Sequence, residues 1–194
     1  LLSSATLSDD NENNAYTISI SEEDATGLTA TQLNAINALT SLPVEASAVT
    51  AMSGSYTDIT NLYASGEFID LGNEAITITD ELTVAQANTL DELTTGVITA
   101  TIGSARVSEL LDESTPLLDA NGNNAYTISI SIEDAAVSAS DLNAINDLTS
   151  VPVDLANVNS ITASDFTDLT TLNANRDEFS NITGIAAITL TDNG

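Results

Sequence analysis

Two short turns in this sequence carry oxygen side chains at alternate positions, an arrangement that could hold a metal ion. One turn reads DDNENN and the other DANGNN, and the alternating residues are Asp9, Asn11, Asn13, Asp119, Asn121 and Asn123. Alternate carboxylate and amide oxygens can converge on one calcium ion, as in the first half of an EF-hand loop. The glycine is misplaced for that loop, however, and no bidentate Glu follows at the proper distance. Since Asp, Asn and Gly also form ordinary turns, a plain turn and a calcium site both stay open. Calcium is the only cofactor these residues suggest.

Catalytic groups are scarce in the rest of the chain. It has no His and no Cys, and its only cations are Arg106 and Arg176. The usual pairs of nucleophile and base need His, Cys or Lys. Carboxylates such as Glu22 and Glu23 could act as an acid/base pair, but acids are spread through every part of the chain, as on a solvated surface. We therefore predict that the protein is not an enzyme.

A third group of candidate residues consists of hydroxyl pairs spaced two apart. Their members are Thr17, Ser19, Thr77, Thr79, Thr99, Thr101, Thr189 and Thr191. Stacked on neighbouring strands about 4.8 Å apart, they would form a flat ladder. Such a ladder could bind ice or carbohydrate, or it could pack against another copy of the chain. The alternative is that Thr simply favours the exposed face of a strand.

Composition limits the partners. The chain has 194 residues, 42% of them apolar, which is enough for a real core. Its formal net charge is -27, so we expect it to repel nucleic acid and anionic membrane surfaces. No uninterrupted apolar run approaches the length that spans a bilayer. We predict no nucleic-acid partner and no membrane insertion.

The elements that position these residues recur along the chain. The letters NNAYTISIS begin at Asn13 and again at Asn123, and the likeness continues through LNAIN and LTS in both copies. A shorter unit with the same layout begins at Asn73. We predict repeats at 13–72, 73–122 and 123–184, flanked by the end of a preceding repeat at 1–12 and the start of another at 185–194. Such internal repetition is typical of solenoids and arrays, and we expect the chain to be a segment of a longer protein.

Each repeat reads as strand, helix, strand, helix. Segments such as AYTISI and AITITD alternate apolar and hydroxyl residues, which is typical of a strand with one buried face, whereas PVEASAV (43–49) and PVDLANV (152–158) read as second strands. Apolar residues three or four apart, such as Leu33 and Ile36, predict helices. Thr29 with Gln32 and Thr83 with Gln86 fit capping boxes, and Ser138 with Asp141 and Thr162 with Asp165 fit looser versions.

These patterns predict an α/β repeat solenoid. Its parallel sheet would have about seven short strands, alternating with about six short helices on one side. A doubly wound sheet would also alternate strands and helices, but it does not need near-identical units. The repetition therefore favours the solenoid.

The segments GLTATQLNAIN, LGNEAITITDELTVAQANTLDELTTGVITATI and LLDANGNNAYTISI resemble repeats of long secreted or surface proteins of marine bacteria, notably marine cyanobacteria. Those proteins are described as β-strand-repeat proteins and sometimes carry calcium-binding RTX-type segments. The resemblance covers nearly the whole chain. It implies export and an extracellular or cell-surface location, and it transfers no active site.

Together these expectations favour a structural role. The protein would be a self-assembling extracellular repeat protein of a filament, sheath or surface layer, with copies of itself as partners. The alternative is an adhesin stalk or a ligand- or calcium-binding surface module, which could use the Thr ladder to bind a surface glycan. Because like-charged copies repel each other, we also expect assembly or folding to depend on salt or calcium.

Overall fold

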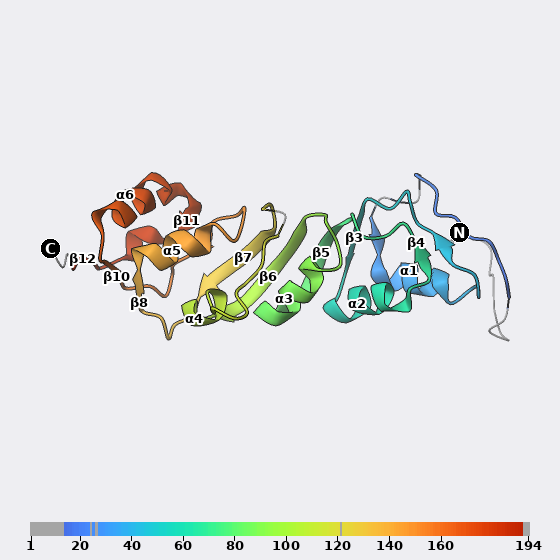
Figure 1. Cartoon of the computed structure of the whole chain (residues 1–194), viewed down its shortest axis with the longest axis horizontal. Helices are drawn as coiled ribbons and strands as arrows, with labels where there is room; N and C mark the ends of the chain where they lie inside the picture. Colours follow the sequence, from blue (N-terminus) through green and yellow to red (C-terminus); the bar gives the residue numbers. More distant parts are fainter. Residues whose placement is uncertain (1–13, 24, 26, 121, 192–194) are drawn as a thin grey trace. The chain divides into compact units, whose positions relative to one another are not determined.

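The computed structural model describes residues 14–23, 25, 27–120 and 122–191 and has an α/β fold (Figure 1). Six α-helices of the described residues alternate with short strands, as the sequence predicts: α1 (Ala30–Asn37), α2 (Tyr56–Ser65), α3 (Val84–Asp91), α4 (Val107–Leu110), α5 (Ala139–Asn146) and α6 (Phe166–Ala174). Seven strands form a parallel sheet in the order β1 (Leu28–Thr29), β3 (Ala51–Gly54), β5 (Ala75–Leu82), β6 (Ile98–Ala105), β7 (Ala125–Ile130), β9 (Val153–Asp154) and β11 (Phe179–Ser180). The expected parallel sheet is thus confirmed.

The chain divides into two compact units, and the division falls within β5. The N-terminal unit runs through Thr79 and includes Leu93–Gly96, whereas the C-terminal unit comprises Asp80–Glu92 and the chain from Val97 onward. In the N-terminal unit, β3 pairs in parallel with β1 and with β5, and β2 (Val44–Glu45) pairs in parallel with β4 (Phe68–Ile69).

The C-terminal unit has the same kinds of pairing. β6 pairs with β7, and β7 and β11 pair with β9, all in parallel. A separate parallel sheet has β10 (Ser160–Ala163) between β8 (Ala136–Ser138) and β12 (Ala187–Leu190). Two short 3-10 helices, Arg176–Glu178 and Ile182–Gly184, flank β11.

Two of the predicted strands are each interrupted by a turn. In the segment 43–49, β2 ends at Glu45 and the Val49 amide donates to the Ala46 carbonyl at 2.9 Å. In 152–158, the Val158 amide donates in the same way to Leu155 at 2.9 Å. The prediction of continuous strands there was wrong, because Val49 and Val158 are buried inside a turn and a buried turn residue fits the same apolar alternation. The first predicted strand, AYTISI from Ala15, contributes only an isolated bridge between Ser19 and Glu45.

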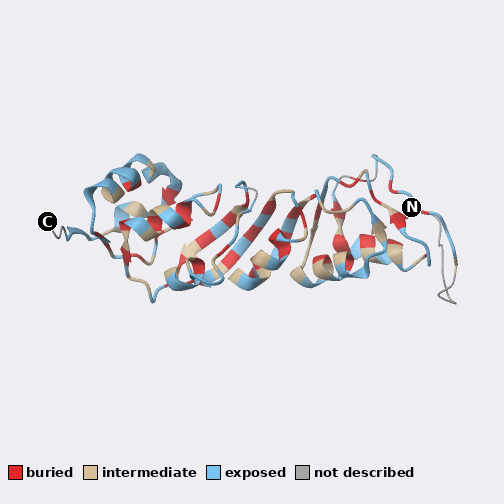
Figure 2. Ribbon diagram, viewed as in Figure 1, coloured by how far each residue is buried: buried red, intermediate tan, exposed pale blue. Residues whose placement is uncertain are grey.

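The buried core is formed by alternate residues of the strands and by the residues on one side of the helices. Figure 2 shows buried and exposed residues alternating along β5, β6 and β7. Ile76, Tyr126 and Ile128 on these strands are fully buried, as are Leu33 of α1 and Leu142 of α5.

Helix starts follow the predicted caps at three of four positions. Thr29 and Thr83 form reciprocal capping boxes with Gln32 and Gln86, and Ser138 accepts the Asp141 amide. The prediction for Thr162 was wrong because that residue lies in β10. The N-cap of α6 is Asp165, whose carboxylate accepts the Thr167 amide at 2.7 Å. This hydrogen bond from the Thr167 amide is the main reason that the pKa of the Asp165 carboxyl is lowered.

Candidate functional sites

Asparagines at matching positions of α1, α3 and α5 form hydrogen bonds that link each helix to a later segment of the chain. Asn34 of α1 donates to the Asp58 carbonyl at 3.1 Å in the N-terminal unit. In the C-terminal unit, Asn143 of α5 donates to the Asp168 carbonyl at 3.0 Å. There too, Asn88 of α3 donates to the Pro116 carbonyl at 2.7 Å and accepts the Leu118 amide at 2.8 Å. The same bond therefore links each helix to the segment some 24 to 30 residues further along.

Threonines after these helices form a second set of recurring bonds. Thr40 donates to the Tyr16 carbonyl and Thr149 to the Tyr126 carbonyl, each at 2.7 Å. Thr94 donates to the Glu74 carbonyl, also at 2.7 Å. Each bond satisfies a backbone carbonyl from a threonine 20 to 24 residues later in sequence, so the repeated letters produce repeated side-chain bonds to the backbone.

A buried polar cluster centres on Asn124 in the C-terminal unit. Its side-chain oxygen accepts the Ile98 amide at 2.9 Å, and its amide nitrogen donates to Asp91 at 2.8 Å and to the Tyr126 hydroxyl at 3.1 Å. Asp91 also accepts the Ala120 amide at 3.3 Å. Burial, followed by the charge of Asp91, raises the pKa of Tyr126 well above its ordinary value.

The N-terminal unit has a comparable cluster around Glu74, which is fully buried. The Tyr63 hydroxyl donates to its carboxylate at 2.6 Å and the Gly72 amide donates at 2.8 Å. Burial and the hydrogen bond to Glu74 raise the pKa of Tyr63 well above its usual range. Gly96 passes so close that an added Cβ would lie 2.2 Å from the Glu74 carbonyl oxygen.

Neither cluster was predicted from the sequence. The one signal was an acid at a helical core position, since Asp91 follows Ala87 and Leu90 on the buried side of α3. Both clusters satisfy buried polar groups with protein partners, which is a structural role.

The predicted calcium ligands have different outcomes. Asp9, Asn11, Asn13 and Asn121 lie outside the described residues. The Asp119 carboxylate accepts the backbone amides of Asn123 and Asn124, both at 3.1 Å, so it caps its own turn, which Gly122 completes with φ +67°. The described part of the chain holds no group of three or more His, Cys, Asp or Glu side chains arranged to bind a metal.

The predicted hydroxyl residues lie on exposed positions, in several short rows. Ser53 of β3 stands between Thr29 and Thr77 in the N-terminal unit. In the C-terminal unit, Thr101 lies opposite Thr127, whereas Thr99 faces Ala125. Thr162 stands between Ser138 and Thr189 in the second sheet. Of the other predicted members, Thr17, Ser19, Thr79 and Thr191 are also exposed, and Thr191 bonds to the Ala163 carbonyl at 3.2 Å.

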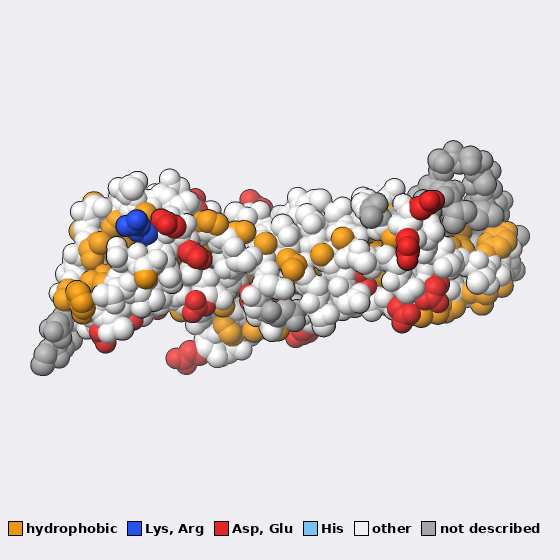
Figure 3. Space-filling view, turned by 90° about the horizontal axis from the view of Figure 1, so that it is seen from above, with side chains coloured by type: hydrophobic (Ala, Val, Ile, Leu, Met, Phe, Trp, Pro, Cys, Tyr) orange, Lys and Arg blue, Asp and Glu red, His pale blue; other side chains and the backbone are white. Residues whose placement is uncertain are grey.

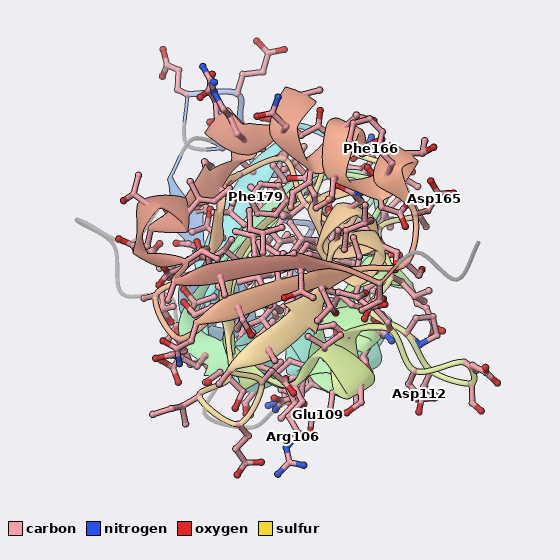
Figure 4. The ribbon with its side chains drawn as sticks, turned by 90° about the vertical axis from the view of Figure 1, so that its left-hand side faces the viewer. Arg106, Glu109, Asp112, Asp165, Phe166 and Phe179 are labelled. Carbon is pink, nitrogen blue, oxygen red and sulfur yellow. The ribbon has the colours of Figure 1, made fainter. Side chains whose placement is uncertain are left out.

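A groove of about 750 Å³ lies in the C-terminal unit between α3, α4 and the ends of β5 and β6. Glu109 and Asp112, which are labelled in Figure 4, line this groove. Glu109 accepts the Arg106 amide at 2.9 Å, and Asp112 accepts the Ser114 and Thr115 amides at 2.8 and 2.9 Å. These backbone bonds, that of Ser114 first, lower the pKa of Asp112. Both carboxylates therefore accept hydrogen bonds from nearby backbone amides.

Comparison with known proteins gives no relative: no family model, curated protein or solved structure matches the chain. Among the described residues, no helix has the length and apolar character needed to cross a membrane. The fold is that of an α/β protein with a parallel sheet. Side-chain hydrogen bonds to the backbone recur along its chain.

Proposed function

We propose that this chain is a structural, self-assembling extracellular repeat protein, folded as a solenoid whose helices lie on one side of its parallel sheet. Its partners would be other copies, in a filament, sheath or surface layer. The observation that carries this proposal is the recurrence of the same bonds, Asn34 with Asn88 and Asn143, and Thr40 with Thr149, at matching places. A chain made by adding equivalent layers can also be extended by a layer from another molecule.

The chemistry of the described residues supports a non-enzymatic role. The buried acids Glu74 and Asp91 are occupied by hydrogen bonds from neighbouring groups. The acids at the groove, Glu109 and Asp112, cap backbone amides. The net charge of -27 argues against nucleic acid as a partner. The extracellular location rests on the resemblance to secreted marine repeat proteins.

Electron microscopy of the purified chain tests assembly directly. Copies with a charge of -27 repel each other, and at about 1 M salt the screening length falls to about 3 Å. We expect ordered filaments or sheets at high salt and dispersed molecules at low salt. Three conditions separate the causes: low salt, high sodium chloride with chelator, and calcium at matched ionic strength. Assembly in sodium chloride with chelator would assign the effect to screening, and assembly only with calcium would assign it to bridging carboxylates. Dispersed molecules in every condition would overturn the proposal.

The exposed hydroxyl rows favour a second candidate, a surface module that binds glycans. Thr101 and Thr127 lie in register on neighbouring strands of an open face, where hydroxyls could meet a flat polysaccharide. Retention on insoluble polysaccharides by the single chain, lost in Thr101→Val with Thr127→Val, would support it. The matched control is Thr31→Val with Thr89→Val, which changes exposed threonines on helices.

A further inference from the structure

The middle of the three predicted repeats has a much shorter second helix than the other two. The helix α2 has 10 residues and α6 has 9, whereas α4 has only 4. After α4 the chain turns back on itself, since the Leu117 amide donates to the Leu110 carbonyl at 2.9 Å. The groove beside α4 lies in the interior of the sequence, and all the residues that line it belong to the C-terminal unit.

In the N-terminal unit, the second helix covers the start of the first. Thr31 in the first turn of α1 donates to the Asp58 carboxylate of α2 at 3.1 Å, and Ala30 beside it is fully buried. At the matching places of α3 stand Ala85, which is exposed, and Val84, which is only partly buried. The first turn of α3 therefore lacks the cover that α2 gives to α1.

This uncovered turn forms one wall of the groove of about 750 Å³. The apolar residues that line the groove are Leu82, Val84, Ala85, Ile102 and Ala105. Gly103 adds open space, because a Cβ built on it would lie 3.7 Å from its nearest atoms outside the adjoining residues. Ligand sites in proteins are typically apolar hollows of about 300 to 1,000 Å³, so the groove has the size and the lining of a binding site.

The charged residues that line the groove are all acidic. Glu109 and Asp112 line it, and no Lys or Arg of the described residues does. A second hollow of about 400 Å³ at α4 adds Asp134 and Asp141. Arg106 points outward at the lower edge of Figure 4 and forms an ion pair with the turn that follows β7. An occupant that complements this surface therefore combines apolar side chains with positive charge.

We infer that this groove binds a helix of another protein, an amphipathic helix that carries basic side chains beside its apolar stripe. A helix is the expected occupant because helices hold the corresponding places in the other two repeats, where α2 bonds to α1 and α6 bonds to α5. In this mode of binding, apolar residues three or four apart enter the groove, and the basic residues would face Glu109 and Asp112.

A second copy of this chain does not supply such a helix. Its only cations, Arg106 and Arg176, lie outside the described α-helices, and two copies with a charge of -27 repel each other. The inference thus adds a partner of a different kind, and it does not depend on the proposed self-assembly.

A synthetic peptide tests the groove. The probe has about 15 residues, with Leu on one stripe of the helix and Lys elsewhere, and its control is a scrambled peptide of the same composition. Binding of each labelled peptide to the full chain is measured by fluorescence anisotropy at one low salt concentration. The inference expects the striped peptide to bind at least about tenfold more tightly. Equal binding would overturn it, because acids are spread over the face drawn in Figure 3 and attract both peptides alike.

Two matched variants locate the binding site. Ala85→Trp places a large side chain at the groove, and Ala144→Trp makes the same change at an exposed alanine of α5 outside it. Ala85→Trp should weaken binding of the striped peptide at least about tenfold, whereas Ala144→Trp should alter it less than about twofold. Equal affinities of the two variants would overturn the inference. Both alanines are exposed, so the urea unfolding of both variants should match that of the wild type.

Cross-linking gives an independent measurement. The chain contains no Cys, so Ser104→Cys places a unique thiol at the groove, and Ser164→Cys places one at an exposed position of the same unit outside it. A striped peptide with a bromoacetyl group at either end should modify the first variant at least about tenfold faster than the second, because binding raises the local concentration of the reactive group. Both rates are divided by the rate with iodoacetamide, which corrects for the reactivity of each thiol.

Equal corrected rates would overturn the inference and would leave the self-assembling function as it stands. Absence of assembly in every salt condition would overturn that function and leave the groove, since the peptide binds the single chain.

Discussion

Asn124 should be one of the most costly side chains to remove, and Asn124→Ala tests the buried cluster that it joins. The side chain is fully buried and bonds to the Ile98 amide, to Asp91 and to the Tyr126 hydroxyl. Alanine leaves the Ile98 amide without its acceptor and removes one of the donors to the Asp91 carboxylate. A buried group left unsatisfied costs about 1 to 3 kcal/mol, and more when it is charged. We therefore expect a loss of about 3 to 5 kcal/mol in the free energy of unfolding.

Urea unfolding followed by circular dichroism measures this loss, with Asn123→Ala as the matched control. Asn123 is the exposed neighbour of the same residue type, so its replacement should change the free energy of unfolding by less than about 0.5 kcal/mol. Hydrogen exchange of the Ile98 amide gives a local readout, because that amide loses its acceptor only in Asn124→Ala. Equal stability of the two variants would refute the account of the cluster.

A double-mutant cycle with Asp91→Ala identifies the cause. If part of the cost of Asn124→Ala comes from the Asp91 carboxylate, that cost should fall by about 1.5 to 3 kcal/mol when Asp91 is already absent. Additive effects of the two substitutions would show that Asp91 is satisfied without Asn124. The cost would then belong to the Ile98 amide and to the lost packing.

Two further predictions concern the N-terminal cluster and the tyrosines. Gly96→Ala should destabilise the fold by at least about 2 kcal/mol, because its Cβ would lie 2.2 Å from the Glu74 carbonyl oxygen. Gly184→Ala, whose Cβ would meet nothing within 4 Å, should be nearly neutral in the same urea titration. Because folding raises the pKa of Tyr63 and Tyr126, their contribution to stability is complete below about pH 10 and is lost as pH rises above it. Unfolding measured from pH 9 to 11.5 should show this loss, with a shallower slope in Tyr126→Phe, and an unchanged slope there would contradict the assignment.

The helix caps and the long strands could be predicted because their causes are local. Thr83 and Gln86 satisfy each other's backbone across three residues, and in β5 the buried Ile76 and Ile78 alternate with the exposed Thr77 and Thr79. The turn at Val49 could not be predicted, because burial in a turn and burial in a strand give the same apolar letter. The role of Asn124 depends on Asp91, more than 30 residues earlier in sequence, and no local pattern reveals such a contact.

The two AYTISI segments show what repetition can and cannot specify. Identical letters give Tyr126 full burial and leave Tyr16 partly exposed, so the neighbouring strand, and not the segment itself, decides whether the apolar row is covered. The chain has 29 acidic residues, yet neither Ala15–Ile20 nor β12 contains one. On the proposed self-assembly, repulsion between copies acts from the acids elsewhere on the surface, over distances that salt screens, so we expect copies to separate at low salt and to associate at high salt.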